Sequence, residues 1–553
     1  MILEVLVYDP VGHEKAISSL KSSKFDYFVK VFSSFHGLVS YLLGRNSYTL
    51  RKSTGSLVEL VPNSAENDLF HNICIVLDSD APHRPEDLFE DKEALLRYRF
   101  QHLNLSVIPF SFESSTDDLN EILEKKSLRK AQLLKDRLPR IQTWVGLIEN
   151  VPPCILTMPN VLETLDKKPD GLSLDAKVGL VQRLANAFDY RSLMELKHPE
   201  GYYSEVVGQW EFPAHDLTID ELLYCGFVML KLGLQNWDAQ NAEMGKSEIP
   251  TLFRNDNTLL SFLFHVRDNY RLGNPFHNFR HAIDVLQASF YFVSKLQAIS
   301  ANDSLINNRL SKELMNPCAT ALLLVASLGH DIGHPGITNP FLTAHKTPVA
   351  AYFKDQSVLE NFHLTQFCSI LEPYAVTAPK FYGSFSQVFI SDCILATDMA
   401  KHDLYTSKIT DFMPMEAVDR SKSGVKTVAT NTLAALLIKC ADISNVCRPL
   451  RVSVKWGISL NQEFSEVAAL ERLMKDSTSA KNVEKVPSVP VSSLTPQSAM
   501  KLVPSLSGSQ LFFIERFAEK FFNEISDSLP ALDFLSEELE KNKLFWKKPA
   551  NTT

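Results

Sequence analysis

Apolar segments with helical periodicity follow one another through most of the chain after about residue 190. Within each segment, apolar residues recur every three to four positions, as they do on the buried face of an α-helix. Helices of this kind bury their apolar faces against one another. The sequence therefore predicts a mainly α protein whose all-helical domain covers residues 191–549. The clearest segments are Leu222–Leu234, Leu259–His265, Ile283–Leu296, Ala319–Leu328, Val388–Ala396, Leu433–Ala441 and Leu511–Ile525.

One stretch of this domain has a different composition. Residues 476–509 are rich in Ser, Pro, Lys and Val, and the prolines at 487, 490, 496 and 504 oppose a long helix. We expect a flexible loop between two helices over residues 476–509.

The first 115 residues follow a mixed pattern. Segments rich in Val, Ile and Phe near residues 5, 75 and 108 are typical of strands, and helical-looking segments such as Phe25–Leu43 separate them. This alternation predicts a small α/β domain with a partly parallel sheet over residues 1–115, whose role is unknown. Residues 116–190, with a basic helical segment and several prolines, are expected to form a connector.

The composition argues against several classes of protein. A net charge of −9 disfavours nucleic-acid binding, which needs clustered positive charge. The eight cysteines include no C-x-x-C pair, so we expect free thiols in a reducing compartment. No signal peptide is evident, and the longest apolar stretch is about half as long as the ~20 residues of a spanning helix. We expect a cytoplasmic protein without membrane or nucleic-acid partners, and a nuclear fraction stays open.

Histidines gather in one quarter of the chain, where eight of the 15 lie between His265 and His402. His277 and His281 are four residues apart, so on a helix they would share one face. His330 and Asp331 follow the apolar segment Ala319–Leu328, and Pro335 and Gly336 are expected to end that helix. A third apolar segment, Leu433–Ala441, ends at Asp442.

Each of these motifs is common by itself, because histidine pairs are often surface or core residues and an Asp at a helix end is often a cap. Their combination is more informative. Apolar helices that end in two His and two Asp could converge on one pocket. Two imidazoles and two carboxylates form a mixed nitrogen and oxygen set that suits zinc.

The full set of motifs resembles the HD superfamily of metal phosphohydrolases. It is most similar to the class I 3′,5′-cyclic-nucleotide phosphodiesterases, and closest to the fungal high-affinity cyclic-AMP enzymes. The resemblance covers roughly residues 190–549 and includes six motifs in the order of the family. They are His277-Asn278-x-x-His281-Ala282-x-Asp284-Val285, His330-Asp331-x-x-His334-Pro335-Gly336-x-x-Asn339, Leu359-Glu360-Asn361, Leu395-Ala396-Thr397-Asp398-Met399, Ala441-Asp442-x-Ser444-Asn445 and Ser509-Gln510-x-x-Phe513.

The resemblance implies a site with two divalent metal ions. A zinc ion would be held by His281, His330, Asp331 and Asp442. Asp331 would also bridge to a second ion, magnesium or manganese. His334, Glu360 and Asp398 match family positions whose side chains orient the ligands and the metal-bound waters.

The resemblance also implies roles in catalysis. A hydroxide between the two metals would attack phosphorus, and His277 would protonate the 3′ oxygen that leaves. Glu463 matches the residue that orients this acid, on a helix that Trp456 aligns. Phe276 stands where many members have Tyr, and Pro340 follows Asn339 where Gln is commoner.

For the nucleobase, the resemblance implies that Gln510 pairs with the purine edge and that Phe513 stacks on its face. Leu460 matches the opposite apolar wall, and Asn445 is a further candidate for base contact. We therefore expect a hydrolase that converts cyclic AMP to 5′-AMP and lowers cyclic-AMP signalling. It would act as a monomer or a homodimer.

Three alternatives stay open. A phosphohydrolase that acts on linear nucleotides is disfavoured by His277, Gln510 and Phe513. A catalytically inactive cyclic-nucleotide sensor or scaffold is disfavoured because every ligand is present. Hydrolysis of both cyclic AMP and cyclic GMP stays possible, because a Gln amide can rotate to pair with either base.

Overall fold

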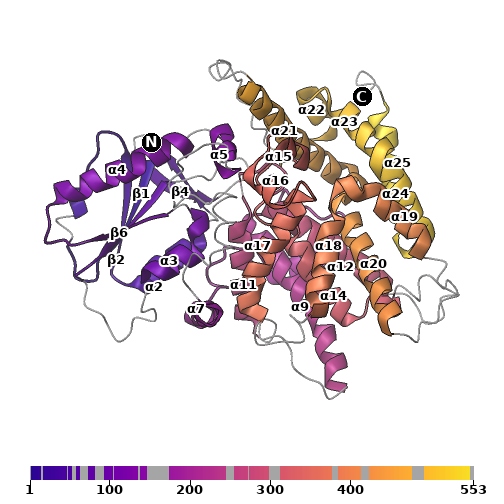
Figure 1. Cartoon of the computed structure of the whole chain (residues 1–553), viewed down its shortest axis with the longest axis horizontal. Coiled ribbons are helices and arrows are strands. Elements are labelled where there is room, and N and C mark those ends of the chain that lie inside the picture. Colours follow the sequence, from indigo (N-terminus) through magenta and orange to yellow (C-terminus); the bar gives the residue numbers. More distant parts are fainter. Residues whose placement is uncertain are drawn as a thin grey trace. The chain divides into compact units, whose positions relative to one another are not determined.

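The computed structural model (Figure 1) describes residues 2–13, 17–45, 48–52, 58–62, 72–80, 92–103, 105–134, 137–145, 173–243, 255–271, 273–297, 312–375, 384–412, 423–475 and 491–548. Contacts divide the chain into two compact units. The first contains residues 1–194 and 340–352, and the second contains residues 195–339 and 353–553.

A parallel sheet forms the centre of the first unit. Its four strands lie in the order β2-β1-β5-β6, and all neighbours are parallel. This confirms the predicted α/β fold of the N-terminal region. A separate antiparallel pair, β3 and β4, follows α2 in the chain. The elements of this unit are β1 (Ile2–Tyr8), β2 (Asp26–Phe32), α2 (Phe35–Gly44), β3 (Tyr48–Lys52), β4 (Val58–Pro62), β5 (Asn72–Asp78), α3 (Lys92–Arg99), β6 (Leu105–Phe110), α4 (Thr116–Leu134), α5 (Arg137–Trp144) and α7 (Leu174–Ala187).

Helices cover both faces of this sheet, with α4 on one face and α2 and α3 on the other (Figure 1). Successive residues of a strand point to opposite faces, so Val5 and Val7 of β1 pack in the cluster that includes Leu119 of α4. Glu4 points the other way, where the guanidinium of Arg45 lies 2.9 Å from its carboxylate. Both faces of β1 are buried, as expected for a parallel strand.

The prediction of a helix over Phe25–Leu43 is wrong in its first part. Residues Asp26–Phe32 form strand β2, and the helix α2 begins only at Phe35. Ser34 separates the two elements and caps the helix, because its side chain accepts a hydrogen bond from the N–H of Gly37. Tyr, Phe and Val in β2 suit a strand, and pairing with β1 decides the outcome.

The second unit is helical throughout its described residues, as predicted. Its helices are α8 (Glu200–Val207), α9 (Ile219–Glu243), α11 (Asp256–Asn269), α12 (Phe279–Gln297), α14 (Pro317–Gly329), α17 (Val358–Ala375), α18 (Ser384–Ala396), α19 (His402–Phe412), α20 (Ser423–Asp442), α21 (Leu450–Lys475), α22 (Pro496–Leu502), α23 (Leu506–Phe513), α24 (Glu519–Ser528) and α25 (Phe534–Trp546). Two short helices, α15 (Asn339–Ala344) and α16 (Pro348–Tyr352), lie between α14 and α17 in the chain.

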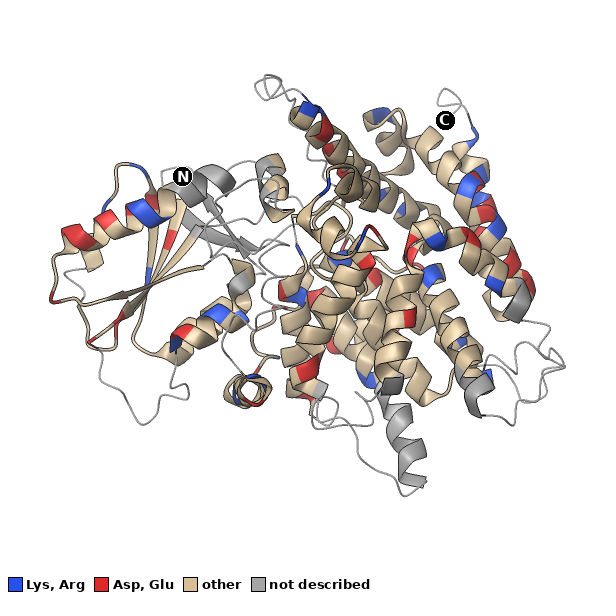
Figure 2. Cartoon of the chain, viewed as in Figure 1, with Lys and Arg blue, Asp and Glu red and all other residues tan. Residues whose placement is uncertain are grey.

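Helix α14 is the core of this unit. Every residue from Ala319 to Gly329 is buried, and the helix packs against α9, α12, α17, α18 and α20. A helix that is apolar on all sides must be enclosed by others. Outer helices differ from it: acidic and basic residues are interspersed along α25 (Figure 2).

The expected loop over residues 476–509 is only partly described. Residues 476–490 lie outside the described part of the chain. Residues Pro496–Leu502 form the short helix α22, so the expectation of a loop is wrong there. Pro496 occupies the first turn, where its missing N–H costs no helical hydrogen bond, and Thr495 and Ser498 form a capping box. None of the described helices is both long enough and apolar enough to cross a membrane.

The core position of α14 gives a stability prediction. Leu324 is fully buried, and an ideal Cβ at Gly233 of α9 would lie only 2.4 Å from its Cδ1. Leu324→Ala should reduce the free energy of unfolding of the helical unit by about 2–5 kcal/mol, measured by urea denaturation followed by circular dichroism. Val428→Ala is the control, because Val428 is 67% exposed. Equal losses for the two variants would contradict this assignment of the core.

Candidate active site

His281 lies in the first turn of α12. Asn278 caps this helix, because its Oδ1 accepts hydrogen bonds from the backbone N–H groups of Arg280 (2.8 Å) and His281 (3.4 Å). The helix begins at Phe279, so the expectation that His277 lies on it is wrong. His277 lies in the preceding turn, and its ring is nevertheless 5.7 Å from that of His281.

His330 and Asp331 follow the last residue of α14. This helix ends at Gly329, earlier than Pro335 and Gly336 suggest. Nδ1 of His330 donates to the carbonyl oxygen of Ser327 at 2.9 Å. This bond fixes the ring and leaves Nε2 free to face a ligand, as in histidines that bind metals.

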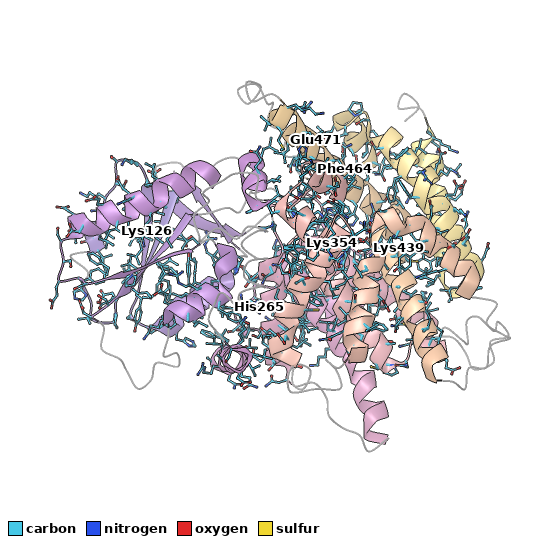
Figure 3. The ribbon with its side chains drawn as sticks, viewed as in Figure 1. Lys126, His265, Lys354, Lys439, Phe464 and Glu471 are labelled. Atoms are coloured by element: carbon cyan, nitrogen blue, oxygen red, sulfur yellow. The ribbon has the colours of Figure 1, made fainter. Side chains whose placement is uncertain are left out.

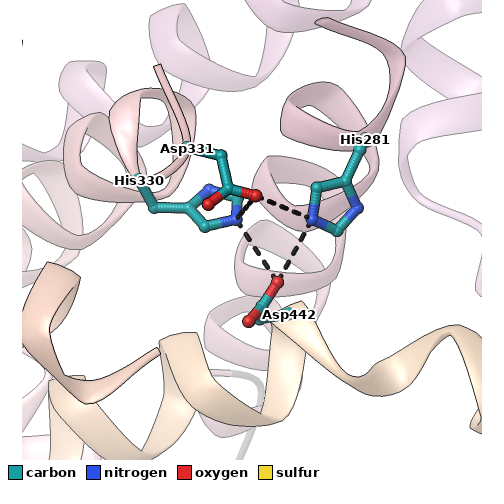
Figure 4. Close-up of side chains that lie close together, drawn as sticks. All are labelled: His281, His330, Asp331 and Asp442. Atoms are coloured by element: carbon teal, nitrogen blue, oxygen red, sulfur yellow. Dashed lines mark hydrogen bonds and ion pairs between the residues drawn. The ribbon is translucent and has the colours of Figure 1, made fainter. Parts of the chain in front are cut away.

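Four side chains from three helix ends converge in one cluster (Figure 4). Nε2 of His281 lies 3.1 Å from Oδ1 of Asp442 and 3.5 Å from Oδ2 of Asp331. Nε2 of His330 lies 3.3 Å from each of the same two oxygens. The structure therefore brings together all four residues that the sequence predicts as ligands.

The spacing and chemistry of this cluster fit a divalent metal ion. Ligands at ~2.0–2.1 Å from a tetrahedral ion are about 3.3–3.4 Å apart, close to the observed separations. Nε2 of His330 is buried and has no hydrogen-bond partner. Burial by itself would raise the pKa of Asp331 and Asp442, but the facing imidazoles outweigh it and hold both pKa values below their usual range. Both carboxylates are therefore ionised and available as ligands.

A second group consists of His277, Glu463 and His334. Nδ1 of His277 forms a short hydrogen bond with Oε1 of Glu463. Oε2 of Glu463 accepts hydrogen bonds from the backbone N–H groups of Phe276 (3.0 Å) and His277 (3.1 Å). The carboxylate thus holds both the ring of His277 and the turn that carries it.

The charge on Glu463 changes the titration of His277. Burial would lower the pKa of His277, but the adjacent carboxylate outweighs it and raises the pKa to about 9. The pKa of Glu463 falls to about 2, because His277 outweighs the effect of burial. His277 is thus a protonated imidazole at neutral pH. The ring of His334 stacks on it at 4.0 Å, and burial together with that charge lowers the pKa of His334 well below its usual value.

Two aromatic rings pack against His281. The ring centroid of Phe276 lies 4.6 Å from that of His281, and the centroid of Trp456 lies 5.8 Å from it. Trp456 is completely buried on α21, the helix that also carries Glu463. Phe276 thus packs against both His281 and Trp456.

Glu360 and Asp398 lie close enough to interact. Burial and the charge of Asp398 raise the pKa of Glu360 to about 7. Both oxygens of Glu360 accept from Nδ2 of Asn339, at 3.2 and 3.0 Å. Asp398 accepts a hydrogen bond of 2.7 Å from Ser357. The charge of Asp331 also contributes to the raised pKa of Glu360.

His363 is a site residue that the sequence analysis missed. It is buried on α17, and its Nδ1 donates to the carbonyl oxygen of Ile332 at 2.8 Å. Its Nε2 has no hydrogen-bond partner and lies 3.6 Å from Oδ1 of Asp331. The signal that could have found it is its spacing, because it follows Glu360 by three residues on one helix face.

Lys439 was also missed. It lies one turn before Asp442 on α20 (labelled in Figure 3) and is completely buried. Its Nζ donates to the carbonyl oxygens of Ala396 (3.0 Å) and Asp398 (3.3 Å). Burial lowers its pKa to about 8. A lysine inside an otherwise apolar segment was the available signal.

Gln510 lies against α21. It is buried, and its Oε1 has no hydrogen-bond partner. An ideal Cβ at Gly457 would lie 2.9 Å from Nε2 of Gln510, so only glycine allows this close approach. Leu460 follows Gly457 by three residues on the same helix and is half-buried. The structure thus places Gln510 and Leu460 in one neighbourhood.

Phe513 and Asn445 are the other two residues predicted to bind substrate. Phe513 ends α23 one turn after Gln510, and its ring is 5.6 Å from that of Phe517. A π-helical turn, Ile514–Ala518, joins α23 to α24, so the helix expected over Leu511–Ile525 is present but contains a π-bulge. Asn445 is buried in a 3₁₀ turn after Asp442, and among the described residues it makes no hydrogen bond to Gln510.

Comparisons with known proteins agree with this geometry. The family model "3'5'-cyclic nucleotide phosphodiesterase" matches residues 276–539, which include every predicted site residue. The chain is 30% identical over 500 residues to 3',5'-cyclic-nucleotide phosphodiesterase 2 of Saccharomyces cerevisiae, covering 82% of this chain and 85% of the yeast protein. The chain belongs to the 3′,5′-cyclic-nucleotide phosphodiesterase family. It is an enzyme of that class.

A solved structure supports the fold of the whole phosphodiesterase. The crystal structure of yeast caPDE2 in complex with IBMX matches with a TM-score of 0.76 and 29% identity, and covers 98% of this chain and 99% of that one. Human phosphodiesterase 8A, named as high-affinity and cAMP-specific, is 28% identical over 357 residues, 61% of this chain and 38% of its own. Other relatives carry names that specify cGMP.

The cluster of ligands gives a metal prediction. Asp331→Ala should remove the ions held at this site from the phosphodiesterase and abolish hydrolysis, because the Asp331 carboxylate faces both imidazoles. Metal content by mass spectrometry and turnover of cyclic nucleotide are the measurements. Asp403→Ala on α19 is the control, because Asp403 is exposed. An active Asp331→Ala variant with its full metal content would refute the assignment.

Proposed function

We propose that this phosphodiesterase hydrolyses 3′,5′-cyclic AMP to 5′-AMP and thereby lowers cyclic-AMP signalling. The observation that carries the proposal is the position of a protonated His277 beside a cluster of metal ligands. A cationic acid next to a site for divalent ions suits the cleavage of a phosphodiester, in which an oxygen leaves as an alkoxide and needs a proton.

His281, His330, Asp331 and Asp442 would hold a zinc ion, and Asp331 would share a second ion, magnesium or manganese. When bound, two such ions supply a hydroxide nucleophile at neutral pH and neutralise charge on the phosphoryl oxygens. The directions of the Asp331 oxygens support this sharing. Oδ2 faces His281 and His330, whereas Oδ1 lies 3.6 Å from Nε2 of His363. His334, Glu360 and Asp398 would orient ligands and waters around the second ion.

His277 would donate its proton to the 3′ oxygen. The bond from phosphorus to this oxygen breaks as the oxygen of a water molecule bonds to phosphorus, so the products are a 5′-phosphate and a free 3′-hydroxyl. Glu463 would keep the imidazole protonated and aimed, since its second oxygen is held by two backbone N–H groups. Nδ1 is occupied by Glu463, so Nε2 of His277 would be the donor.

Gln510, Phe513, Leu460 and Asn445 would bind the purine. The unpartnered Oε1 of Gln510 can accept from the 6-amino group of adenine. Phe513 and Leu460 would contact opposite faces of the base. Preference for cyclic AMP is supported by this acceptor and by the resemblance to fungal cyclic-AMP enzymes. Guanine would require the Gln510 amide to be turned.

Product analysis tests the substrate and the reaction together. Purified protein, supplied with zinc and magnesium, should convert cyclic AMP to 5′-AMP, with little turnover of cyclic GMP and with complete inhibition by a chelator. Comparable turnover of both nucleotides would discard the adenine preference. If metal-loaded protein binds cyclic AMP without turnover, the chain is a cyclic-nucleotide sensor and not a hydrolase. Faster turnover of linear nucleotides would indicate a different phosphohydrolase.

The pairing of His277 with Glu463 predicts a change in pH dependence. An acid catalyst acts in its protonated form, so activity is lost as the pH rises through the pKa of His277. Glu463→Gln removes the charge that raises this pKa, and the basic limb of the kcat profile should move to lower pH by about 1–3 units. The measurement is kcat as a function of pH at saturating cyclic AMP.

Two variants serve as controls for this experiment. Glu471→Gln, on the same helix α21, should leave the profile unchanged (Figure 3). His277→Ala should reduce kcat by about 10²–10⁴-fold with metal content intact, and should remove the limb. A basic limb that stays in place in Glu463→Gln would show that His277 is not the titrating acid.

A further inference from the structure

The sheet of the first unit contains a point where connections run in opposite directions. From β1 the chain continues to β2 on one side, whereas β5, the neighbour of β1 on the other side, leads to β6. In open parallel sheets, ligands bind at such a point, outside the carboxyl ends of the two strands. Asp9 follows the last residue of β1, and Asp78 is the last residue of β5.

These two aspartates and His13 meet at that edge. One carboxylate oxygen of each aspartate and one ring nitrogen of His13 all lie within 4.8 Å of one another. Asp9 is 3% exposed and Asp78 is 7% exposed. Two carboxylates are thus buried close together, and neither forms an ion pair with Lys or Arg among the described residues.

Asp78 provides an independent indication of a ligand. Its Oδ1 accepts a hydrogen bond from the N–H of Asp80 at 3.1 Å. Its Oδ2 is buried and has no hydrogen-bond partner. A buried carboxylate oxygen without a partner is unfavourable, because it has lost its hydration without replacement. A bound ligand would give this oxygen the partner that the polypeptide does not supply.

Asp9 is held in place as an ionised ligand. Its Oδ1 accepts from the N–H of Gly12 at 2.8 Å and from Nδ1 of His13 at 2.9 Å. Burial would raise its pKa, but the hydrogen bonds from Gly12 and His13 outweigh burial and lower it. The ring of His13 is itself fixed by stacking on Phe112 with a centroid distance of 4.9 Å. His13 therefore positions the carboxylate, whose Oδ2 accepts the N–H of His13 and, among the described residues, no other donor.

We propose that Asp9 and Asp78 form a binding site for a hard divalent cation, magnesium or manganese, in the first unit. Each carboxylate contributes one oxygen, and water fills the other positions. Magnesium is typically bound in this way, by one or two carboxylates with several waters retained. The ion supplies the positive charge that the two buried carboxylates lack. This site is independent of the ligand cluster at His281 and does not rest on the proposed reaction.

The test counts manganese ions bound to the full-length chain by electron paramagnetic resonance. Asp78→Asn should bind one equivalent fewer than the natural chain, whatever number the active site holds. It should hydrolyse cyclic nucleotide at the natural rate. Asp118→Asn is the matched control, because Asp118 is an exposed aspartate of α4 in the same unit, and it should lose no equivalent.

Thermal stability separates loss of binding from loss of folding. In the presence of chelator, Asp78→Asn should melt at the same temperature as the natural chain or higher, because the buried charge has been removed. The increase in melting temperature on adding manganese should be smaller in this variant. If Asp78→Asn binds as many manganese ions as the natural chain, the proposal is wrong.

A measurement on the unaltered chain covers the case in which the variant does not fold. Iron(II) bound in place of magnesium generates hydroxyl radicals with ascorbate and peroxide, and these radicals cut the backbone near the ion. Mass spectrometry should find cuts beside Asp9 and Asp78 that excess magnesium suppresses. Cuts near the active site alone would overturn the proposal without affecting the proposed reaction.

Discussion

Two carboxylates, those of the buried Asp331 and the half-buried Asp442, face two imidazoles at distances of 3.1–3.5 Å, and the helical unit is arranged around this contact. Isolated charges are costly inside a protein, so these carboxylates can be buried only where compensating groups converge on them. Helix α14 makes the convergence possible. Because it is apolar on every side, it is enclosed by α12 and α20, and the polar residues at its end emerge where those helices also begin or end. The packing of apolar side chains therefore determines where the charged group lies.

His277, the proposed proton donor, is held by a separate set of contacts. Glu463 comes from α21, and it ties down the turn before α12 through two backbone N–H groups as well as through the ring of His277. This separation matters, because a ligand must offer a lone pair whereas an acid must keep its proton. His281 and His330 face two carboxylates that could share a cation with them, whereas the carboxylate of Glu463 raises the pKa of His277 and keeps it charged. Asn274 connects two members of the His277 group, since its Nδ2 donates to the carbonyl oxygens of both His277 and His334 at 2.8 Å.

The sequence predicted that His281, His330, Asp331 and Asp442 would lie close together, because each is near the end of an apolar helix and apolar periodicity is the clearest local signal. It failed where tertiary contacts decide. Asp26–Phe32 is a strand because β1 lies beside it, which no local pattern reveals. His277 reaches the site from a turn, and its position depends on Glu463, which is 186 residues away in the sequence. His363 was missed because a single histidine in an apolar helix resembles a core residue, and only its 3.6 Å separation from Asp331 identifies its place.

The partners of buried carboxylates distinguish supporting residues from candidate ligands throughout the chain. Glu4 in the first unit is buried beside the guanidinium of Arg45, and Asp284 in the second is buried 3.1 Å from Arg448, so each has a permanent cation. Such pairs need nothing further and stabilise a packing arrangement. Asp331 and Asp78 are buried without an ion pair to Arg or Lys among the described residues. Among the described residues, Asp331 faces imidazoles, and Oδ2 of Asp78 has no hydrogen-bond partner. Burial is unfavourable for a carboxylate that has no Arg or Lys beside it. Such a carboxylate is positioned to bind a cation from solution.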